Sequence, residues 1–554
     1  MFLLIAIVSI TILQLKNVAA TDELPDIGWP SPHATSRGEV WPLPQKAEYG
    51  KENRTIRRGS IMIAWQGIRD VDCDILEFAK RTYQKEWFFP NRNPAASPGG
   101  LKLIIRSDAK CPEKDEYPQQ GMNEEYYLRV PVAGDAVLEA DEVWGILRGL
   151  ESFSQLIFQT RGAHFVRTAV IHDWPEYTVR GVLIDTARHY IPKKILMRQL
   201  DIMAQNKFNL LHWHIVDSQS FPYVSKKYPH LSERSAYTPS HVYNKNTVQE
   251  IIDHAKMRGI RVMVEFDTPG HMASWKGELG LLAECHDESG HSVLSNIIDP
   301  TLERNYAFLR NFYDEILSVF PEKFIHLGGD EVGFWKTCWL TNPKIRDFMM
   351  HKGFDENTTM LENYYYDRLQ DLISDIIGVD KEARMVFWEE VFQYNNPYPK
   401  SVVHVWYSAS EKARNDALQR YTAAGHEVIL SSCWYLNYVN YGADWKDEGS
   451  KSGQFYYCNP RGFNGSEEQK KLVLGGIAAL WGEFVDGTNI ESVLWPRASA
   501  VAERLWSNPK QTTDADQAWP RLHEHRCRLV SRGYRASPIN GPDYCITEYD
   551  EPST

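Results

Sequence analysis

The chain is 554 residues long, which exceeds one ordinary domain and suits a large barrel joined to a smaller unit. Its hydrophobic content of 43% and charged content of 24% are typical of a folded protein and exclude an intrinsically disordered chain. The formal net charge of −12, without a cluster of Lys and Arg, argues against nucleic acid as a partner.

The first segment, from Met1 to about Ala20, is typical of a secretory signal peptide. Phe2 to Leu15 is an apolar core, and Val18-Ala19-Ala20 offers small residues for cleavage. The apolar run is shorter than the roughly 20 residues that a membrane span needs, and no later segment is long and apolar enough. We therefore expect a protein of the secretory pathway, lysosomal or extracellular, without a stable membrane anchor.

Residues 24–175 are predicted to form a smaller α/β domain. Strands are expected at Ser60–Ala64, Leu101–Ile105 and Tyr126–Val130, and a helix at Glu142–Gln159. Chemically reactive side chains do not converge in this segment, so we expect its role to be structural.

From about residue 178, strand-like apolar runs alternate with helical runs. The runs rich in Val, Ile and Leu are Val179–Ile184, Asn209–Ile215, Ile260–Phe266, Phe324–Leu327, Met385–Trp388, Val402–Trp406, Val428–Leu430 and Leu474–Leu480. Helical stretches between most of them include Lys194–Lys207, Val248–Arg258, Leu302–Val319 and Leu361–Ile377. This alternation predicts a parallel sheet, and its eight repeats predict a closed (β/α)₈ barrel over residues 176–554.

Two further expectations concern the helices of this region. The connection from Gln393 to Ser401 is short and proline-rich, so we expect the helix between the fifth and sixth strands to be missing. Leu494–Trp506 and Trp519–Arg532 are predicted to be helices that close the barrel.

Polar and aromatic groups follow each predicted strand. In a barrel of this kind, the chemistry lies at the C-terminal ends of the strands. In chain order those ends supply Arg180 through Arg188; His212, His214 and Asp217; Asp267 and His271; Asp330 and Glu331; Trp388 and Glu389; Trp406; Trp434 and Tyr435; and Trp481 and Glu483. One buried Trp is usually core packing, but three at corresponding strand ends are better explained as the wall of a pocket.

The segment His326-Leu327-Gly328-Gly329-Asp330-Glu331 places two acids side by side after the fourth strand. Neighbouring side chains of a straight strand point to opposite faces, so both acids can enter one pocket only if the backbone turns, which the glycine pair permits. Paired carboxyls suit hydrolysis of a glycosidic bond, where one donates a proton and the other stabilises positive charge. An isolated Asp-Glu is more often a solvated surface loop, but the other strand ends favour a site.

Eight cysteines and three sequons fit an exported chain. The cysteines, none of them in a CxxC or in the spacing of a zinc site, are Cys73, Cys111, Cys285, Cys338, Cys433, Cys458, Cys527 and Cys545. Their even number predicts disulfides, whose pairing the spacing leaves open. Asn53, Asn357 and Asn464 begin Asn-x-Ser/Thr sequons and are candidate glycosylation sites.

Taken together, these motifs closely resemble the β-N-acetylhexosaminidases of glycoside hydrolase family 20, over nearly the whole mature chain. The resemblance is carried by Arg180-Gly181 with Asp185–His189, and by His212–Asp217, Glu265–His271, His326–Glu331, Trp434–Asn437 and Trp481–Glu483. It implies a zincin-like α/β domain without metal ahead of the barrel, a glycosidase without a cofactor, and a homodimer.

The resemblance also implies a retaining, substrate-assisted mechanism. The substrate's own 2-acetamido oxygen attacks the anomeric carbon and forms a cyclic oxazolinium intermediate. By the match, Glu331 is the general acid and then the base, while Asp330 holds the acetamido N–H and stabilises the positive charge. The expected substrate is a terminal β-linked GlcNAc or GalNAc on N-glycans, other glycoconjugates or chitin oligomers.

The remaining substrate-binding residues that the resemblance implies are Arg180, Asp217, His271, Trp388, Trp406, Tyr435, Asn437, Trp481 and Glu483. The three Trp resemble a hydrophobic box around the N-acetyl methyl group, and Tyr435 resembles the donor to its carbonyl oxygen. Arg180 and Glu483 resemble residues that bind the ring hydroxyls, and Asp217 with His271 resembles a pair that orients Glu331.

Three disulfides carry over from the family by position: Cys73–Cys111, Cys285–Cys338 and Cys527–Cys545. Cys433 and Cys458 are left, and we predict that they pair and brace the loop that carries Tyr435 and Asn437.

The chain departs from the family pattern at two places. Asn437-Tyr438 stands where the subunit able to process sialylated glycolipid has an Asn-Arg pair, which argues against efficient use of acidic glycans. Gly333 replaces an acidic residue that is common after the catalytic pair, which would open the site beyond the first sugar.

Two other classes of function compete with this interpretation. His212-x-His214 with His271 and Asp330 could imitate the metal set of a metal-dependent amidohydrolase, although the His pair follows the second strand and no Lys completes a binuclear site. A non-catalytic glycan-binding protein on the same barrel is the second alternative, but both acids and the aromatic wall are present.

Overall fold

The computed structural model describes residues 36–89, 99–160, 163–378, 383–407, 410–440, 442–446, 455–539 and 544–545. The predicted signal peptide, residues 1–20, lies outside the described residues. Within them, no helix combines the length and the apolar character that crossing a bilayer requires.

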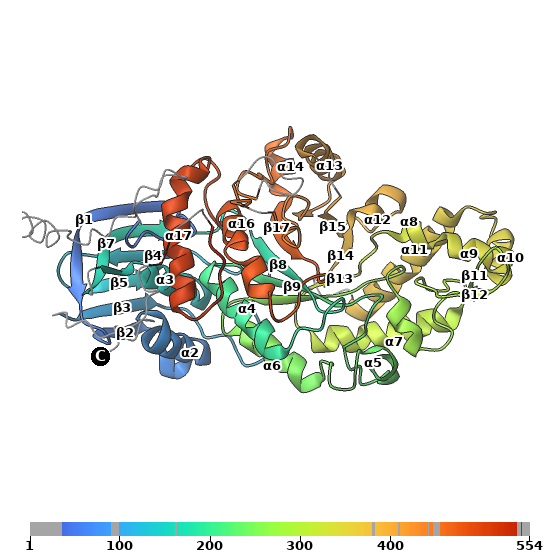
Figure 1. Ribbon diagram of the computed structural model, residues 1–554, viewed down its shortest axis with the longest axis horizontal. Coiled ribbons are helices and arrows are strands. Elements are labelled where there is room, and N and C mark those ends of the chain that lie inside the picture. Colours follow the sequence, from blue (N-terminus) through green and yellow to red (C-terminus); the bar gives the residue numbers. More distant parts are fainter. Residues whose placement is uncertain are drawn as a thin grey trace, which may run out of the picture.

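The N-terminal unit is a mixed β-sheet with two helices (Figure 1). Its strands run in the order β1-β7-β4-β5-β3-β2, with β6 paired to β7. Their bounds are Lys46–Ile56 (β1), Ile61–Gly67 (β2), Leu101–Ser107 (β3), Tyr126–Val130 (β4), Ala136–Glu139 (β5), Ile157–Thr160 (β6) and Ala163–Asp173 (β7). The helices are α2 (Asp74–Thr82) and α3 (Val143–Gln155), and the short helices η1 (Asp70–Asp72) and η2 (Tyr83–Trp87) flank α2.

The three strands predicted in this unit are confirmed, but the predicted helix Glu142–Gln159 is too long. α3 ends at Gln155, and the following Ile157–Thr160 is β6, in which Phe158 lies opposite Phe165 of β7. β-branched and aromatic side chains favour a strand when a partner strand is available, and that partner comes later in the chain.

The second unit is a closed barrel of eight parallel strands, as predicted. The strands are Val179–Asp185 (β8), Leu210–Val216 (β9), Arg261–Phe266 (β10), Phe324–His326 (β13), Arg384–Trp388 (β14), Val402–Val405 (β15), Val428–Leu430 (β16) and Val473–Leu480 (β17). β17 pairs with β8 and closes the ring. The chemical groups that follow the eight strands therefore meet at one mouth.

The helices around the barrel are α4 (Lys193–Gln205), α5 (His230–Ser235), α6 (Lys245–Lys256), α7 (Glu303–Val319), α8 (Val332–Trp335), α9 (Thr337–Thr341), α10 (Pro343–His351), α11 (Thr358–Ile377), α12 (Glu389–Tyr394), α13 (Glu411–Ala423), α14 (Glu467–Lys471), α15 (Ile490–Leu494), α16 (Arg497–Trp506) and α17 (Ala515–Ser531). Short elements between β10 and α7 are η3 (Ala273–Gly277), β11 (Cys285–His286) and β12 (Ser292–Val293).

The prediction that no helix follows the fifth strand is wrong in part. α12 begins directly after Trp388, with Glu389 and Glu390 in its first turn, where acidic side chains favour the positive end of the helix dipole. It ends before Pro397 and Pro399, as the proline-rich connection requires. The helix is six residues long, so it covers little of the barrel but places two acids at the mouth.

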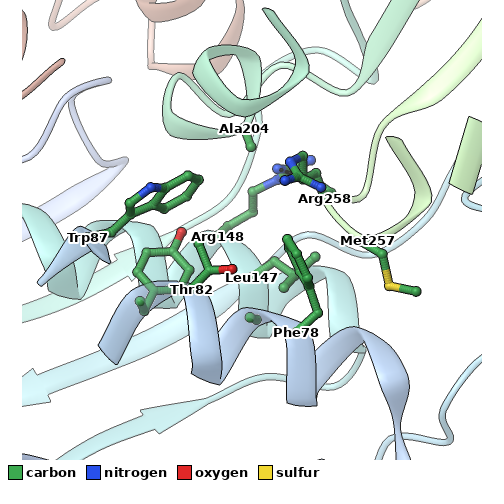
Figure 2. Close-up of a pocket in the computed structure, with 10 residues that line it drawn as sticks. Phe78, Thr82, Trp87, Leu147, Arg148, Ala204, Met257 and Arg258 are labelled. Carbon is green, nitrogen blue, oxygen red and sulfur yellow. Dashed lines mark hydrogen bonds between the residues drawn. The ribbon is translucent and has the colours of Figure 1, made fainter. Parts of the chain in front are cut away.

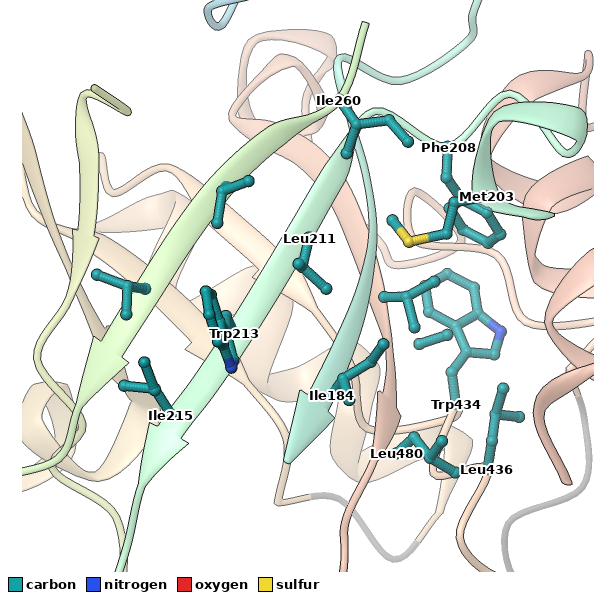
Figure 3. Close-up of a cluster of buried hydrophobic side chains, with 14 of the residues drawn as sticks. Ile184, Met203, Phe208, Leu211, Trp213, Ile215, Ile260, Trp434, Leu436 and Leu480 are labelled. Carbon is teal, nitrogen blue, oxygen red and sulfur yellow. The ribbon is translucent and has the colours of Figure 1, made fainter. Parts of the chain in front are cut away.

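Alternation along the strands separates two apolar layers. Leu211, Trp213 and Ile215 of β9 belong to the core between the barrel and its helices (Figure 3). The intervening His212 and His214 therefore point into the barrel, where the side chains are otherwise mainly apolar. Buried imidazoles at such places need hydrogen-bond partners, and the site supplies them.

The two units are joined by buried ion pairs. Glu124 accepts from Arg148 of α3 at 2.8 Å and from Arg180 of β8 at 2.6 Å. α17 lies against α3, with Arg532 3.3 Å from Glu151 (Figure 1). Nearby, α2, α3 and α4 enclose a small cavity of about 20 Å³, enough for about one water, which Figure 2 shows.

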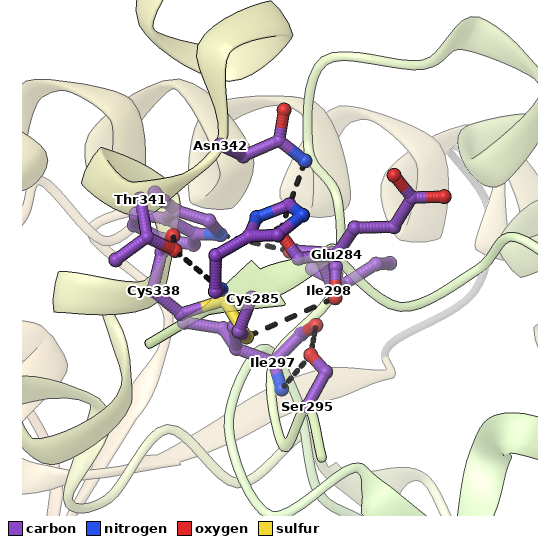
Figure 4. The surroundings of a disulfide bond; sticks show 11 residues. Glu284, Cys285, Ser295, Ile297, Ile298, Cys338, Thr341 and Asn342 are labelled. Atoms are coloured by element: carbon purple, nitrogen blue, oxygen red, sulfur yellow. Dashed lines mark hydrogen bonds between the residues drawn. A yellow bond between two sulfur atoms is a disulfide. The ribbon is translucent and has the colours of Figure 1, made fainter. Parts of the chain in front are cut away.

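All eight cysteines form disulfides, in the pairs Cys73–Cys111, Cys285–Cys338, Cys433–Cys458 and Cys527–Cys545. The second pair ties the loop after β10 to α9, and next to it Thr341 accepts the backbone N–H of His286 (Figure 4). It thus connects the segments that follow the third and fourth barrel strands. The asparagines of the three sequons, Asn53, Asn357 and Asn464, are exposed.

Candidate active site

Asp330 and Glu331 lie where the backbone turns sharply after β13. Gly328 and Gly329 have φ of 73° and 102°, and Glu331 itself has the left-handed values φ 55° and ψ 15°. A Cβ on Gly328 would lie 1.7 Å from Oδ1 of Asp267, so only glycine fits there. The Asp330 side chain is 12% exposed and that of Glu331 40% exposed, so the turn brings the first acid inside and leaves the second facing the mouth.

His271 stands between these acids and Asp217. Its Nδ1 lies 3.2 Å from Asp217, and its Nε2 lies 3.4 Å from Glu331 and 3.7 Å from Asp330. The predicted group of Asp217, His271, Asp330 and Glu331 is therefore brought together by the loops after β9, β10 and β13. His271 also has a positive φ of 56°, which aims the ring from a tight turn.

The charges in this group reinforce one another. Burial alone would lower the pKa of His271, but the carboxylates of Asp217 and Asp330 outweigh it and raise that pKa well above the usual range. Burial alone would raise the pKa of Asp217, but the positive charges of His271 and Arg188 hold that pKa well below its usual range. The hydrogen bond from His271 lowers the pKa of Glu331. A protonated His271 between carboxylates is thus the stable state.

A second buried carboxylate, Glu265 of β10, is the centre of a polar network inside the barrel. Its Oε2 lies 2.7 Å from Nε2 of His212 and 2.9 Å from Nδ1 of His214. Its Oε1 accepts the indole N–H of Trp388 at 2.8 Å. Since His214 contacts Asp217 through its other nitrogen at 2.8 Å, a continuous chain of contacts connects Trp388 with Glu331.

The set of residues that could imitate an amidohydrolase metal site does not converge. Among the described residues, His212 is near His326 and His404, whereas His271 is near Asp330 and Glu331. His214 faces Glu265 and Asp217 instead. The His-x-His pair therefore serves the Glu265 network, and its two rings do not share one metal position with the acids.

Trp388, Trp406, Tyr435 and Trp481 form one aromatic wall. The ring centroids of Trp388 and Trp481 are 6.0 Å apart, those of Trp388 and Trp406 6.4 Å, and those of Trp406 and Tyr435 6.2 Å. Tyr435 is half-buried, and desolvation raises the pKa of its phenol, so the hydroxyl stays a donor. The predicted pocket wall at successive strand ends is therefore present.

Arg180 does not belong to the site, contrary to the expectation. It is the second residue of β8, at the opposite end of the barrel, where its guanidinium binds Glu124 and the carbonyl groups of Tyr177 and Lys207. The arginine at the mouth is Arg188, which follows the C-terminal end of β8 at Asp185. It lies 3.0 Å from Asp185, 2.8 Å from Asp217 and 4.0 Å from Glu483.

Asn437 and Glu483 are at the mouth in different environments. Glu483 is half-exposed beside Arg188. Oδ1 of Asn437 is buried without a hydrogen-bond partner among the described residues, which leaves an acceptor available next to Tyr435. The loop that carries both Tyr435 and Asn437 is held by Cys433–Cys458 and by Arg497, which donates to the carbonyl groups of Leu436 and Tyr438.

Four residues of the site were not assigned a role from the sequence: Arg188, Glu265, Asp267 and Glu390. Arg188 follows the C-terminal end of its strand and Arg180 does not, so strand position alone could have chosen between them. Burial and the Asp330 carboxylate raise the pKa of Asp267 well above the usual range, and its Oδ1 accepts the N–H of Gly329 at 2.9 Å. Such contacts depend on the fold and have no signal in the sequence.

Comparison with known proteins agrees with this geometry. Residues 177–509 match the family model "Glycosyl hydrolase family 20, catalytic domain", and residues 40–156 match "beta-acetyl hexosaminidase like". The chain is 47% identical to beta-hexosaminidase A of Caenorhabditis briggsae, over 95% of this chain and 96% of the relative, and 42% identical to beta-hexosaminidase subunit beta of Homo sapiens, over 94% and 92%.

Solved structures show the same architecture. A chitobiase of Flavobacterium johnsoniae superposes with a TM-score of 0.72 at 26% identity, covering 89% of this chain and 73% of that one. An exo beta-N-acetylglucosaminidase of Vibrio harveyi, in complex with N-acetylglucosamine, gives a TM-score of 0.73 at 21% identity over 94% and 80%, which shows a shared fold.

Proposed function

The chain belongs to glycosyl hydrolase family 20, and from this and the geometry of its site we propose that it hydrolyses terminal β-linked GlcNAc or GalNAc from the non-reducing ends of glycans. The observation that carries the proposal is the position of His271, which contacts Asp217, Asp330 and Glu331 beside a wall of aromatic rings. An acid pair next to an apolar wall suits a sugar that carries an N-acetyl group.

The reaction we propose is retaining and substrate-assisted. The acetamido oxygen of the substrate forms a bond to the anomeric carbon while the bond to the leaving oxygen breaks, and Glu331 gives that oxygen its proton. Glu331 then removes a proton from the water that opens the oxazolinium ring. Asp330 holds the acetamido N–H and stabilises the cation. Intramolecular attack lowers the barrier by roughly 7–11 kcal/mol, and a positioned acid adds roughly 10²–10⁴-fold.

In this mechanism the aromatic wall binds the acetamido group of the substrate. In this proposal Trp388, Trp406 and Trp481 enclose its methyl group and the Tyr435 hydroxyl donates to its oxygen, which the short distances between these rings support. Arg188 and Glu483 lie 4.0 Å apart and take over the part expected of Arg180, binding the hydroxyls of the sugar ring. Correct orientation of the acetamido oxygen is the larger part of the catalysis.

The general acid role of Glu331 favours activity at acid pH. A general acid must carry its proton when the substrate binds. The hydrogen bond from His271 lowers the pKa of Glu331, so the free site gains that proton only in acid. A fall in pH therefore increases the fraction of Glu331 that carries its proton, while His271, whose pKa is raised well above the usual range, stays positively charged.

The biological setting follows from other features. We propose that the protein acts in the secretory pathway, the lysosome or the extracellular space, as a homodimer glycosylated at Asn53, Asn357 and Asn464. The support is the exposure of the three asparagines, the four disulfides and the relationship to proteins named as subunits. Neutral N-glycans and chitin oligomers are favoured over acidic glycans, since Tyr438 provides no positive charge beside Asn437.

The proposal is tested by incubating the purified protein with a chromogenic N-acetylglucosaminide and its N-acetylgalactosaminide counterpart. We expect turnover of both at acid pH, with the β-anomer as the first product in proton NMR spectra. Release of the α-anomer, or a covalent ester between the sugar and a side chain, would contradict the mechanism. Activity after treatment with a strong chelator distinguishes the site from that of a metal-dependent amidohydrolase.

A further inference from the structure

Glu390, the second residue of α12, lies between two parts of the site that the proposed mechanism uses for different tasks. Its Oε2 accepts a 2.8 Å hydrogen bond from the indole Nε1–H of Trp406. Its Oε1 accepts the backbone N–H of Glu331 at 3.5 Å. One side chain therefore contacts both the aromatic wall and the peptide that carries the general acid.

Both contacts act on groups whose orientation has to be held. Glu331 has a left-handed backbone conformation, which a residue other than glycine keeps only when its surroundings hold it. The main chain of Trp406 is fixed by Glu389, whose Oε1 accepts the N–H groups of Trp406 and Tyr407 at 2.9 and 2.7 Å. Glu389 thus holds the backbone of this segment, and Glu390 holds the ring.

The groups around Glu390 favour a neutral carboxyl. Two acids face it: Asp330 from the loop after β13, and Glu389 from α12 itself. The phenol of Tyr435 faces it from the loop after β16. Burial, followed by the charge of Asp330, raises the pKa of Glu390 to about 8. Two neighbouring acids in one desolvated site do not both ionise readily, which favours the neutral form of Glu390.

We propose that Glu390 is a positioning residue for the hydrolysis, which as a neutral carboxyl holds the Trp406 ring at the acetamido group and the Glu331 peptide at the leaving oxygen. The inference rests on the proposed function, because it assigns those tasks to Trp406 and Glu331. An ionised Glu390 would add a second negative charge beside Asp330 and disturb the arrangement of the pair. Glu390 does not itself contact the reacting atoms in this scheme.

The first test compares two variants with different consequences. Glu390→Gln keeps the shape and the neutral charge, and its amide oxygen can still accept the 2.8 Å hydrogen bond from Trp406, so it should retain most of the kcat and the KM of the unmodified protein at acid pH. Glu390→Ala removes both contacts and should lower kcat by about 10²-fold with a smaller change in KM, because a small displacement of the reacting groups costs that much. Glu411→Gln, on the exposed first turn of α13, is the matched control and should change neither constant.

The second test reads the proton directly and needs no turnover. An infrared difference spectrum between the unmodified protein and Glu390→Gln should contain the carbonyl stretch of one protonated carboxyl at pH 6. That band should disappear as the pH rises through about 8. The same difference spectrum for Glu411→Gln should contain no such band.

The outcomes separate this inference from the proposed function. If Glu390→Gln is as inactive as Glu390→Ala, or the protonated band is missing, the neutral role is wrong. If Glu390→Ala keeps its kcat, the positioning role is wrong, and if that variant does not fold, Glu390→Gln and the spectrum still decide. If the unmodified protein hydrolyses neither glycoside, the proposed function fails, while the spectrum still reports the state of Glu390.

Discussion

The indole Nε1–H of Trp388 donates a 2.8 Å hydrogen bond to Glu265, a carboxylate buried in the middle of the barrel. The other oxygen of the same carboxylate contacts His212 and His214. The Glu265 side chain therefore fixes the Trp388 ring of the aromatic wall. It also fixes His214, from which the series of contacts continues to Glu331.

Replacement of Glu265 by Gln should impair both catalysis and stability. The amide nitrogen cannot accept the hydrogen bonds of the imidazoles, so a buried donor is left unpaired at a cost of about 1–3 kcal/mol. We expect a lower melting temperature and a fall in kcat larger than the rise in KM. Glu315→Gln is the matched control, because Glu315 accepts four hydrogen bonds from Tyr223, Ser225, Lys226 and Lys227 away from the site. It should lose stability but keep kcat once folded.

Glu331→Gln should abolish most turnover while leaving ligand binding nearly intact. The amide keeps the shape of the side chain but has no proton to give to the leaving oxygen. We expect kcat to fall by roughly 10²–10⁴-fold on an unactivated glycoside. Isothermal titration with N-acetylglucosamine should give an almost unchanged affinity. Equal loss of binding and turnover would show that Glu331 is structural.

Asp330→Asn should weaken binding of a thiazoline mimic of the intermediate far more than it weakens binding of the sugar product. In its protonated form the mimic places positive charge and an N–H opposite the Asp330 carboxylate, and the neutral amide cannot stabilise that charge. The ratio of the two inhibition constants is the measurement. An unchanged ratio would contradict the role assigned to Asp330.

His271→Asn should move the alkaline limb of kcat/KM to higher pH. His271 lowers the pKa of Glu331, and removing the imidazolium lets that pKa rise, so Glu331 keeps its proton further into the neutral range. Asn is a suitable substitute because it tolerates the positive φ at this position. His291→Asn, at an exposed histidine, is the control and should leave the pH profile unchanged.

The same variant should show a stability deficit that depends on pH. The pKa of His271 is raised in the folded protein, so its stabilising contribution is complete below its ordinary value of about 6.5 and is lost as the pH rises through the folded value. The melting temperatures of the two proteins should therefore differ most in acid and approach each other in alkali. A constant difference would contradict the charged state of His271.

Arg188→Lys and Arg180→Lys should have opposite signatures. Arg188 lies at the mouth, so its loss should raise KM by about 10-fold or more with a small change in melting temperature. Arg180 donates to Tyr177, Lys207 and Glu124 below the barrel, so its replacement should lower the free energy of unfolding by about 1–3 kcal/mol and leave KM unchanged. The reverse pattern would restore Arg180 to the substrate site.

The barrel could be predicted because each of its strands is a short apolar run and helical runs lie between most of them. In the N-terminal unit, the sequence pattern predicts that a helix continues through β6, since the partner strand β7 that makes Ile157–Thr160 extended is encoded later in the chain. The proline-rich stretch after Tyr394 predicts no helix there, but α12 lies before those prolines. Local periodicity does not contain either piece of information.

In the site, the acid pair and the aromatic wall could be predicted because they follow strands whose ends meet at one mouth. The motif Arg180-Gly181 predicts a substrate role for Arg180, but this residue begins β8 and therefore lies at the end of the barrel opposite the mouth. Glu265 and Glu390 have no signature in the sequence, because their importance depends on rings and peptides supplied by other strands. Those contacts exist only once the barrel has closed.

The turn at Gly328 sets a limit on how this protein can vary. A methyl group there would occupy the space of the Asp267 carboxyl, so an alanine would have to displace that acid from beside Asp330. The new carbon would also lie 2.7 Å from the backbone Cα of Asp267 and force a residue with a side chain into a left-handed conformation, so the variant should lose activity and some stability. Natural variants and engineered libraries should therefore tolerate exchanges in the packed interior more readily than the addition of one carbon atom at this position.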